Sequence, residues 1–291
     1  MNSIANLKKE RFSGVVSKAA QKKIQTIIDT WYVVKKHWQS KNDKSVKIGY
    51  SSMNLITVTL PCKQFHTDKE IKRQLLNHLI IKLTRDYNVK HYIWKAEAQN
   101  NGNLHFHMII DQYINWKELR NVWNEITEKL GYITNFEMLH KHRNPNSTDI
   151  HKIGKVRNIV AYMAKYMSKS EGKRFDSGRV WGCSDSLRSL KPIVLCYSNK
   201  MASAVSRMEI DKSFRCKKLD YATVVYGDII GYFKQNENEV FKEILQWIEI
   251  LRLLMEGSTV GEILEEKKET TKQSKQVIIT EKLVQLKINF S

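Results

Sequence analysis

The chain has 291 residues, which is enough for one large domain or for a catalytic domain with a smaller one, and 42% of its residues are hydrophobic. This composition supports an ordinary core and excludes a disordered protein. Forty-nine Lys and Arg against thirty Asp and Glu leave a formal charge of +19. Such a charge indicates a polyanionic partner, and nucleic acid is a better candidate than a merely basic, solvated surface.

The four cysteines indicate neither a zinc ribbon nor a disulfide framework, because no C-x-x-C pair occurs among Cys62, Cys183, Cys196 and Cys216. We expect them to be reduced. The N-terminus has no apolar run typical of a signal peptide, and no stretch reaches the length that spans a bilayer. We therefore expect a soluble cytoplasmic protein without a membrane partner.

Residues 13–37 predict an amphipathic helix with a basic outer face and Ser17 as a plausible N-cap. Its apolar positions recur at helical spacing: Ala20, Ile24, Ile27, Ile28 and Trp31. Lys35–Lys47 lacks apolar periodicity and predicts a linker. Residues 1–46 thus form an N-terminal helix and linker in this interpretation, and a domain covering 47–190 follows.

The domain begins with a β-branched, alternating strand at Asn54–Pro61 and continues with a helix at Thr67–Arg85. Two strands, Val89–Gln99 and Leu104–Asp111, are joined by the turn Asn100–Asn103, a strong hairpin signal.

Asn115 is expected to cap a helix over Trp116–Leu130 that ends at Gly131. Tyr132–Leu139 then predicts a strand, and the polar stretch His140–His151 predicts a loop.

A helix over about 155–169 and a short strand or turn at Arg179–Ser184 complete the domain. This order predicts an α+β fold with one antiparallel sheet and helices on one face. Residues 191–291 are expected to be mainly helical, with the clearest stripe at 240–255 and a polar connector at 265–276.

The most informative stretch is His105-Phe106-His107, which follows Gly102 on a predicted strand. A strand alternates faces, so the two imidazoles point the same way, and the hairpin brings Glu97 opposite them. Two imidazoles and a carboxylate suit Mg²⁺ or Mn²⁺ in a phosphoryl-transfer site. Gln99 lies on the same face and could replace Glu97 as the third ligand. Composition alone yields roughly 0.3 such H-x-H matches, and His140-Lys141-His142 serves as a control without strand context.

Tyr162 and Tyr166 are four residues apart on a predicted helix and therefore share one face. Lys169 lies on that face and Lys165 is one turn from Tyr162. A nearby ammonium or metal favours the phenolate, which is the nucleophilic form of tyrosine. Packing of both tyrosines in a core is the alternative interpretation.

These residues resemble the HUH endonucleases, in particular the two-tyrosine rolling-circle replication initiators of the microvirus type. The resemblance is carried by His105–His107 and by Tyr162-Met-Ala-Lys-Tyr-Met-Ser-Lys169. Leu55–Leu60 is similar to the family's first motif, and Arg179–Ser184 to a block downstream of the tyrosines. The match runs from about 54 to 186.

The resemblance implies an RRM/ferredoxin-like nuclease palm in which His105, His107 and Glu97 hold Mg²⁺ or Mn²⁺. It implies that Tyr162 or Tyr166 attacks single-stranded origin DNA, forms a 5′-phosphotyrosine link and frees a 3′-OH, and that the strand is later religated. A host polymerase would extend that end in a bacterial cytoplasm. A host helicase is implied too, because the sequence has no P-loop.

Three alternatives stay open on the sequence. A plasmid mobilisation relaxase or a transposase of the same superfamily would use similar chemistry. A non-catalytic nucleic-acid-binding protein would leave His105 and His107 merely structural. A histidine-triad nucleotide hydrolase expects a third histidine at position 109, which is Ile109.

Overall fold

The computed structural model describes residues 16–42, 53–152, 178–190, 199–219, 222–259, 261–263 and 289–290. The described residues fall into two compact units. The first contains 16–18, 54–151 and 178–182, and the second contains 19–42 and the residues from 183 onward, together with Met53 and Lys152. The helix predicted over 155–169 and the connector at 265–276 lie outside the described residues.

A five-stranded sheet in the order β4-β1-β3-β2-β5 forms the centre of the first unit. Its strands are β1 (Asn54–Thr59), β2 (Tyr92–Ala98), β3 (Leu104–Ile110), β4 (Thr148–Lys152) and β5 (Trp181–Cys183). The central strand β3 pairs antiparallel with both β1 and β2. The α+β class and the antiparallel sheet predicted from the sequence are confirmed.

The β2–β3 hairpin turns where the sequence predicted it. Gly102 adopts φ +87°, a conformation that costs glycine little, and Gln99 N donates to Asn103 O at 2.8 Å. Alternate residues of β3 (Leu104, Phe106 and Met108) are at most 1% exposed. These side chains fix one face of the strand in the core, so His105 and His107 lie on the other face.

The predicted helix at 67–85 is present as three consecutive segments, α2 (Asp68–Glu70), the π-helical η1 (Ile71–Leu76) and α3 (Asn77–Asp86). Thr67 and Glu70 form a capping box at its start. Its buried residues recur every four positions, at Ile71, Leu75, Leu79 and Leu83. A repeat of four exceeds the 3.6 residues of an α-helical turn, and the wider π turn absorbs part of that excess.

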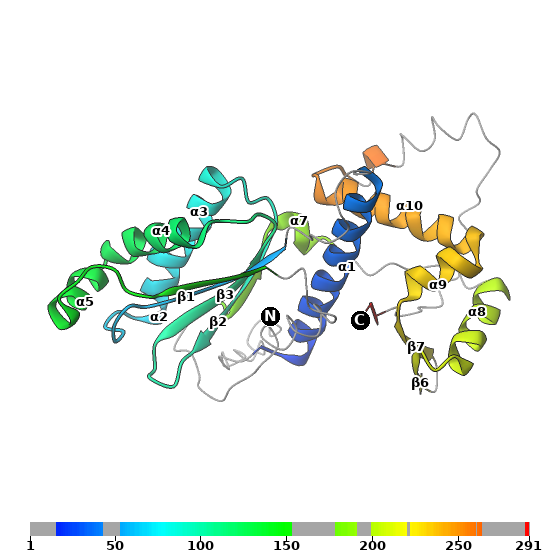
Figure 1. Cartoon of the computed structure of the whole chain (residues 1–291), viewed down its shortest axis with the longest axis horizontal. Coiled ribbons are helices and arrows are strands. Elements are labelled where there is room, and N and C mark those ends of the chain that lie inside the picture. Colours follow the sequence, from blue (N-terminus) through cyan, green and yellow to red (C-terminus); the bar gives the residue numbers. More distant parts are fainter. Residues whose placement is uncertain are drawn as a thin grey trace, which may run out of the picture. The chain divides into compact units, whose positions relative to one another are not determined.

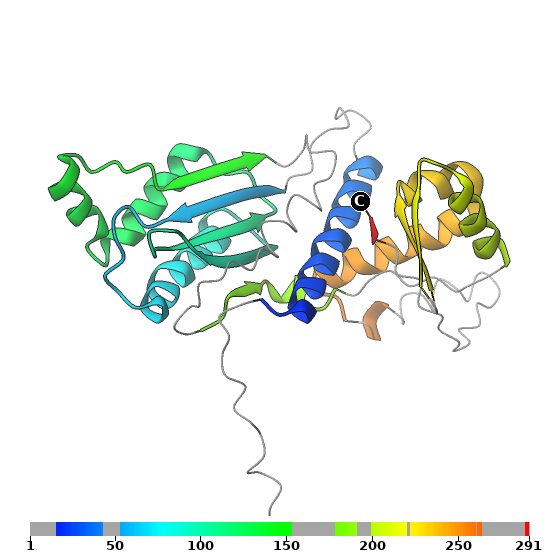
Figure 2. The same ribbon diagram turned by 90° about the horizontal axis from the view of Figure 1, so that it is seen from below.

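Helix α4 (Trp116–Glu128) begins at Asn115, whose Oδ1 accepts from Lys117 N at 2.9 Å as predicted. Trp123 is fully buried and donates from Nε1 to Thr59 O at 2.6 Å. Figures 1 and 2 show α3 and α4 on the same side of the sheet. The opposite face of β1, β2 and β3 is the one that carries the histidines.

The strand predicted at Tyr132–Leu139 is wrong, because these residues form α5 (Tyr132–His140). Gly131, at φ +75°, reverses the chain after α4, and the Glu128 carboxylate accepts from Thr134 N at 2.9 Å and from Thr134 Oγ1 at 2.6 Å. Tyr132 is fully buried and Ile133 is 3% exposed. These contacts override the β propensity of the aromatic and β-branched residues.

The loop predicted at His140–His151 is wrong in its last part, where Thr148–His151 belong to β4. Thr59 N donates to Ser147 O at 2.9 Å where the chain enters this strand. A polar edge strand is held by backbone pairing and leaves no apolar alternation in the sequence.

The second unit contains α1 (Lys18–Asn42), whose apolar residues Ile24, Ile27, Ile28 and Trp31 are at most 1% exposed. The helix continues through residues 35–42, where the sequence predicted a linker. Lys and Gln are good helix formers, and an established helix propagates through them without an apolar repeat.

The C-terminal region is mainly helical, as predicted, with α7 (Asp185–Arg188), α8 (Asn199–Ile210), α9 (Ile229–Asn236) and α10 (Asn238–Met255). It also contains a sheet that the sequence interpretation missed, in the order β6 (Arg215–Leu219), β7 (Ala222–Gly227) and β8 (Asn289–Phe290). Val240, Ile244, Ile248 and Leu251 form the buried stripe of α10. None of the described helices has the length and apolar composition needed to cross a membrane.

Candidate metal centre

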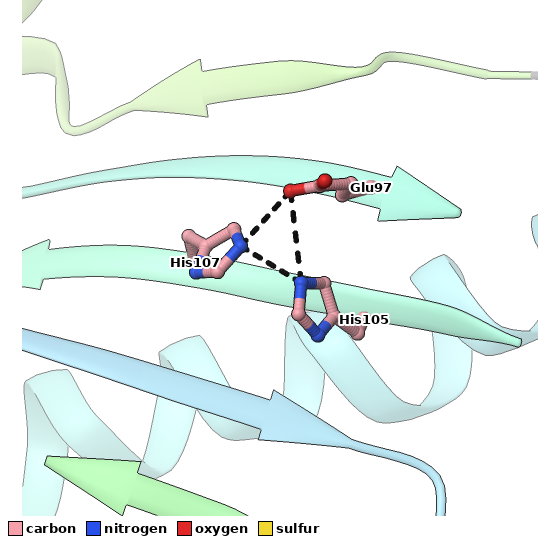
Figure 3. Close-up of side chains that lie close together, drawn as sticks. All are labelled: Glu97, His105 and His107. Atoms are coloured by element: carbon pink, nitrogen blue, oxygen red, sulfur yellow. Dashed lines mark hydrogen bonds and ion pairs between the residues drawn. The ribbon is translucent and has the colours of Figure 1, made fainter. Parts of the chain in front are cut away.

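Three side chains from β2 and β3 converge on the face of the sheet opposite α3 and α4. Nε2 of His105 and Nε2 of His107 are 2.7 Å apart, and Oε2 of Glu97 lies 3.0 Å from the latter and 3.7 Å from the former. Figure 3 shows the carboxylate and the two rings pointing toward one another. Among the described residues this is the one group of three or more potential ligands.

Strand register explains this convergence. Glu97 lies directly opposite His105 in the β2–β3 pair, and His107 follows one pleat further along the same face. The hairpin turn at Gly102 sets this register, so the pairing of Glu97 with the histidine strand predicted from the sequence is confirmed.

The donor atoms fit a small divalent cation. Bonds of about 2.1 Å to imidazole nitrogen and carboxylate oxygen place neighbouring donors about 3 Å apart, and the observed separations lie close to that value. The side chains are 16%, 7% and 15% exposed for His105, His107 and Glu97. The cluster is therefore sheltered but reachable from solvent, as a site that binds a ligand must be.

Both titration shifts favour the state that binds a cation. Hydrogen bonds from His105 and His107 hold the pKa of the Glu97 carboxyl far below its usual range. Burial lowers the pKa of His107 below the ordinary value of 6.5, and the hydrogen bond to Glu97 opposes this only in part. At neutral pH Glu97 is thus an anion and His107 is a neutral imidazole with a lone pair to donate.

The ring nitrogens that point away from the cluster are held by neighbouring side chains. Thr57 lies opposite His107 in the β1–β3 pair, and its Oγ1 is 3.1 Å from His107 Nδ1. The Gln99 amide nitrogen is 3.3 Å from His105 Nδ1. Gln99 therefore takes the place of a supporting residue beside His105, and the third donor at the cluster is Glu97.

A buried cation lies beside the cluster. Lys95 is the residue opposite His107 in the β2–β3 pair and is only 3% exposed. Its charge contributes to the lowered pKa of both Glu97 and His107. The sequence interpretation missed Lys95 and Thr57, although both follow from the period-2 pattern once the strands are aligned.

The cluster opens into a surface pocket of about 440 Å³ that runs toward the hairpin turn. Carboxamide side chains dominate its lining, which consists of Glu97, Ala98, Gln99, Asn100, Asn101 and His105.

The control motif is not a metal site: His140 and His142 are exposed, and their rings lie 4.3 and 5.1 Å from that of Phe136. The predicted catalytic residues Tyr162, Lys165, Tyr166 and Lys169 lie outside the described residues.

Comparison with known proteins gives one family. Residues 53–171 match the model of a family described as replication-associated protein ORF2, and no curated protein or solved structure matches. The matched stretch is less than half of the chain. It covers the whole of β1 to β4, the Glu97–His105–His107 cluster and the segment with Tyr162 and Tyr166. This part of the chain is therefore similar to replication-associated proteins.

Proposed function

We propose that the protein initiates rolling-circle replication by nicking single-stranded DNA at an origin, in the manner of the HUH endonucleases. The observation that carries the proposal is the convergence of Glu97, His105 and His107 on one open face of the sheet. The similarity of residues 53–171 to replication-associated proteins and the formal charge of +19 support it.

In this proposal Glu97, His105 and His107 hold Mg²⁺ or Mn²⁺. The cation supplies Lewis-acid polarisation of the scissile phosphate and compensates the charge that develops on its oxygens. Glu97 offsets one of its two charges, and the neutral imidazoles offset none. A positive site for the DNA backbone therefore remains after the metal is bound.

Covalent chemistry is assigned to Tyr162 and Tyr166. The phenolic oxygen of one tyrosine loses its proton and attacks the phosphorus, and the bond from phosphorus to the 3′ oxygen breaks. The 3′ oxygen takes up a proton and leaves as a free 3′-OH, while the 5′ side stays linked as a phosphotyrosine. Lys165 and Lys169 favour the phenolate by their charge.

Two tyrosines permit a second nick after one round of synthesis. The second phenol cleaves the regenerated origin, and the released 3′-OH attacks the first phosphotyrosine and closes the circle. Each exchange conserves one phosphoester bond, so no nucleotide hydrolysis is needed. A host helicase and a host polymerase in a bacterial cytoplasm would open and extend the strand.

The test is formation of a covalent adduct. The full-length protein is incubated with single-stranded oligonucleotides that tile the element encoding it, with Mn²⁺ or Mg²⁺, and is then run on a denaturing gel. We expect a metal-dependent adduct that survives in Tyr162→Phe and in Tyr166→Phe and is lost in the double variant. A folded protein that binds the DNA and forms no adduct with either metal would show a non-catalytic binding protein.

A further inference from the structure

Gln99 connects the metal cluster to β1. Thr59 Oγ1 donates to Gln99 Oε1 at 3.0 Å, and Gln99 Nε2 lies 3.3 Å from His105 Nδ1. Thr59 is also the residue opposite His105 in the β1–β3 pair. A hydroxyl, a carboxamide and an imidazole thus form a chain of hydrogen bonds that ends at a candidate ligand.

The direction of this chain determines which nitrogen of His105 carries its proton. An amide N–H donates to Nδ1 only when that nitrogen has a lone pair, and a neutral imidazole then holds its proton on Nε2. Nε2 of His105 is the atom that points at Glu97 and His107. In the structure as described, the amide therefore selects the tautomer that keeps His105 from donating to a cation.

Cation binding requires the opposite tautomer. Nε2 of His105 must present its lone pair, so Nδ1 carries the proton and needs an acceptor. A half-turn of the Gln99 carboxamide places Oε1 against Nδ1 and lets Nε2 donate to the Thr59 hydroxyl, with hardly any other movement. His107 has no such requirement, because the Thr57 hydroxyl beside its Nδ1 can either donate or accept.

We propose that Gln99 is a positioning residue of the metal site whose side-chain amide reverses when a divalent cation binds and thereby sets the tautomer of His105. The inference rests on the metal site of the proposed function and adds a group that contacts neither the cation nor the DNA. It also gives the Thr59–Gln99 pair a purpose beyond holding the end of β1 to the hairpin.

Three variants separate this role from others. Gln99→Glu has an acceptor in either orientation, so we expect Mn²⁺ to bind at least fivefold more tightly. Asn101→Asp adds the same charge to the same pocket, and we expect a smaller gain because Asn101 bonds to the backbone of Asn103 and not to His105. Gln99→Leu removes the acceptor and is expected to weaken Mn²⁺ binding about tenfold. Gln112→Leu, at the far end of β3, should leave binding unchanged.

Tautomers are read directly by long-range ¹H–¹⁵N correlation on the full-length protein, with Zn²⁺ as a diamagnetic probe. The wild type is expected to change from Nε2–H to Nδ1–H at His105 on titration, and Gln99→Glu to show Nδ1–H already without metal. Equal Mn²⁺ affinity of wild type and Gln99→Leu, or an unchanged His105 tautomer in a metal-bound wild type, would overturn the inference. Failure of wild type to bind either cation would overturn the metal site itself, and this inference with it.

Discussion

Lys95 faces His107 across the β2–β3 pair and is almost fully buried beside a cluster whose donors suit a cation. A buried ammonium raises the electrostatic cost of placing a divalent ion nearby. The same charge attracts a phosphate that approaches the site. Lys95 thus opposes binding of metal alone and favours binding of metal together with DNA.

We therefore expect Lys95→Met to bind Mn²⁺ about fivefold more tightly than wild type in the absence of DNA, a change of roughly 1 kcal/mol. Addition of a single-stranded oligonucleotide should raise Mn²⁺ affinity more in wild type than in the variant. Electron paramagnetic resonance of free Mn²⁺ measures both quantities. Lys90→Met, a lysine just before β2, is the matched control and should resemble wild type. Weaker Mn²⁺ binding by Lys95→Met would contradict this assignment.

Thr57→Val removes the hydroxyl at His107 Nδ1 and keeps the shape of the side chain. The ring loses the partner that orients it, and a metal-bound His107 would be left with a poorly satisfied Nδ1–H. We expect Mn²⁺ affinity to fall about tenfold. Thr57→Ser retains the hydroxyl and should bind within about twofold of wild type, so equal losses in the two variants would argue for a packing effect.

How far the sequence predicts this site depends on how local each contact is. Glu97 and His105 are eight residues apart, and the turn at Gly102 fixes their pairing, so the sequence places them together correctly. Thr57 and Lys95 needed the register of whole strands. Thr57 is fifty residues from His107, and no local signal aligns β1 with β3.

The fold shows the same limit. Amphipathic helices and the hairpin carry strong local patterns and were predicted correctly. Tyr132 has a high β propensity, yet it lies in α5 because its burial and the Thr134–Glu128 contacts decide the conformation. The edge strand β4 is polar and is recognisable only through its pairing with β1.

His107 should titrate below 6.5, because burial lowers the pKa of its imidazole. The Glu97 carboxylate opposes this, so we expect Glu97→Gln to lower the pKa of His107 further. Below pH 6.5 the unfolded chain binds a proton at this residue before the folded chain does, and the free energy of unfolding falls as the pH falls through that window. A histidine-detected NMR titration of metal-free protein measures both pKa values. A midpoint above 6.5 for His107 in wild type would contradict the expected shift.

Gly182 in β5 has no room for a side chain, since a Cβ there would lie 2.9 Å from Trp94 Nε1 and 3.0 Å from its ring carbons. We expect Gly182→Ala to destabilise the protein by about 1–3 kcal/mol through overpacking. Gly257→Ala is a useful comparison, because its Cβ meets open space and only its φ of +101° costs energy. Urea unfolding of the two variants gives the difference, and combining Gly182→Ala with Trp94→Phe should recover part of the loss.

Asp29 of α1 is 5% exposed, and burial raises the pKa of its carboxyl from 3.8 to about 7, although a hydrogen bond from Gln25 opposes the shift. The folded chain therefore holds a proton that the unfolded chain releases between these pH values, and stability falls as the pH rises through this window. The loss for this residue amounts to at most about 4 kcal/mol. Asp29→Asn keeps the acceptor for Gln25 and cannot ionise, so we expect it to stabilise the protein at pH 8 and to have little effect at pH 4. Asp185→Asn, at a side chain that is 91% exposed, is the control. Denaturant unfolding at several pH values measures the difference, and an equal effect of Asp29→Asn at both pH values would show that the carboxyl of Asp29 is not the cause.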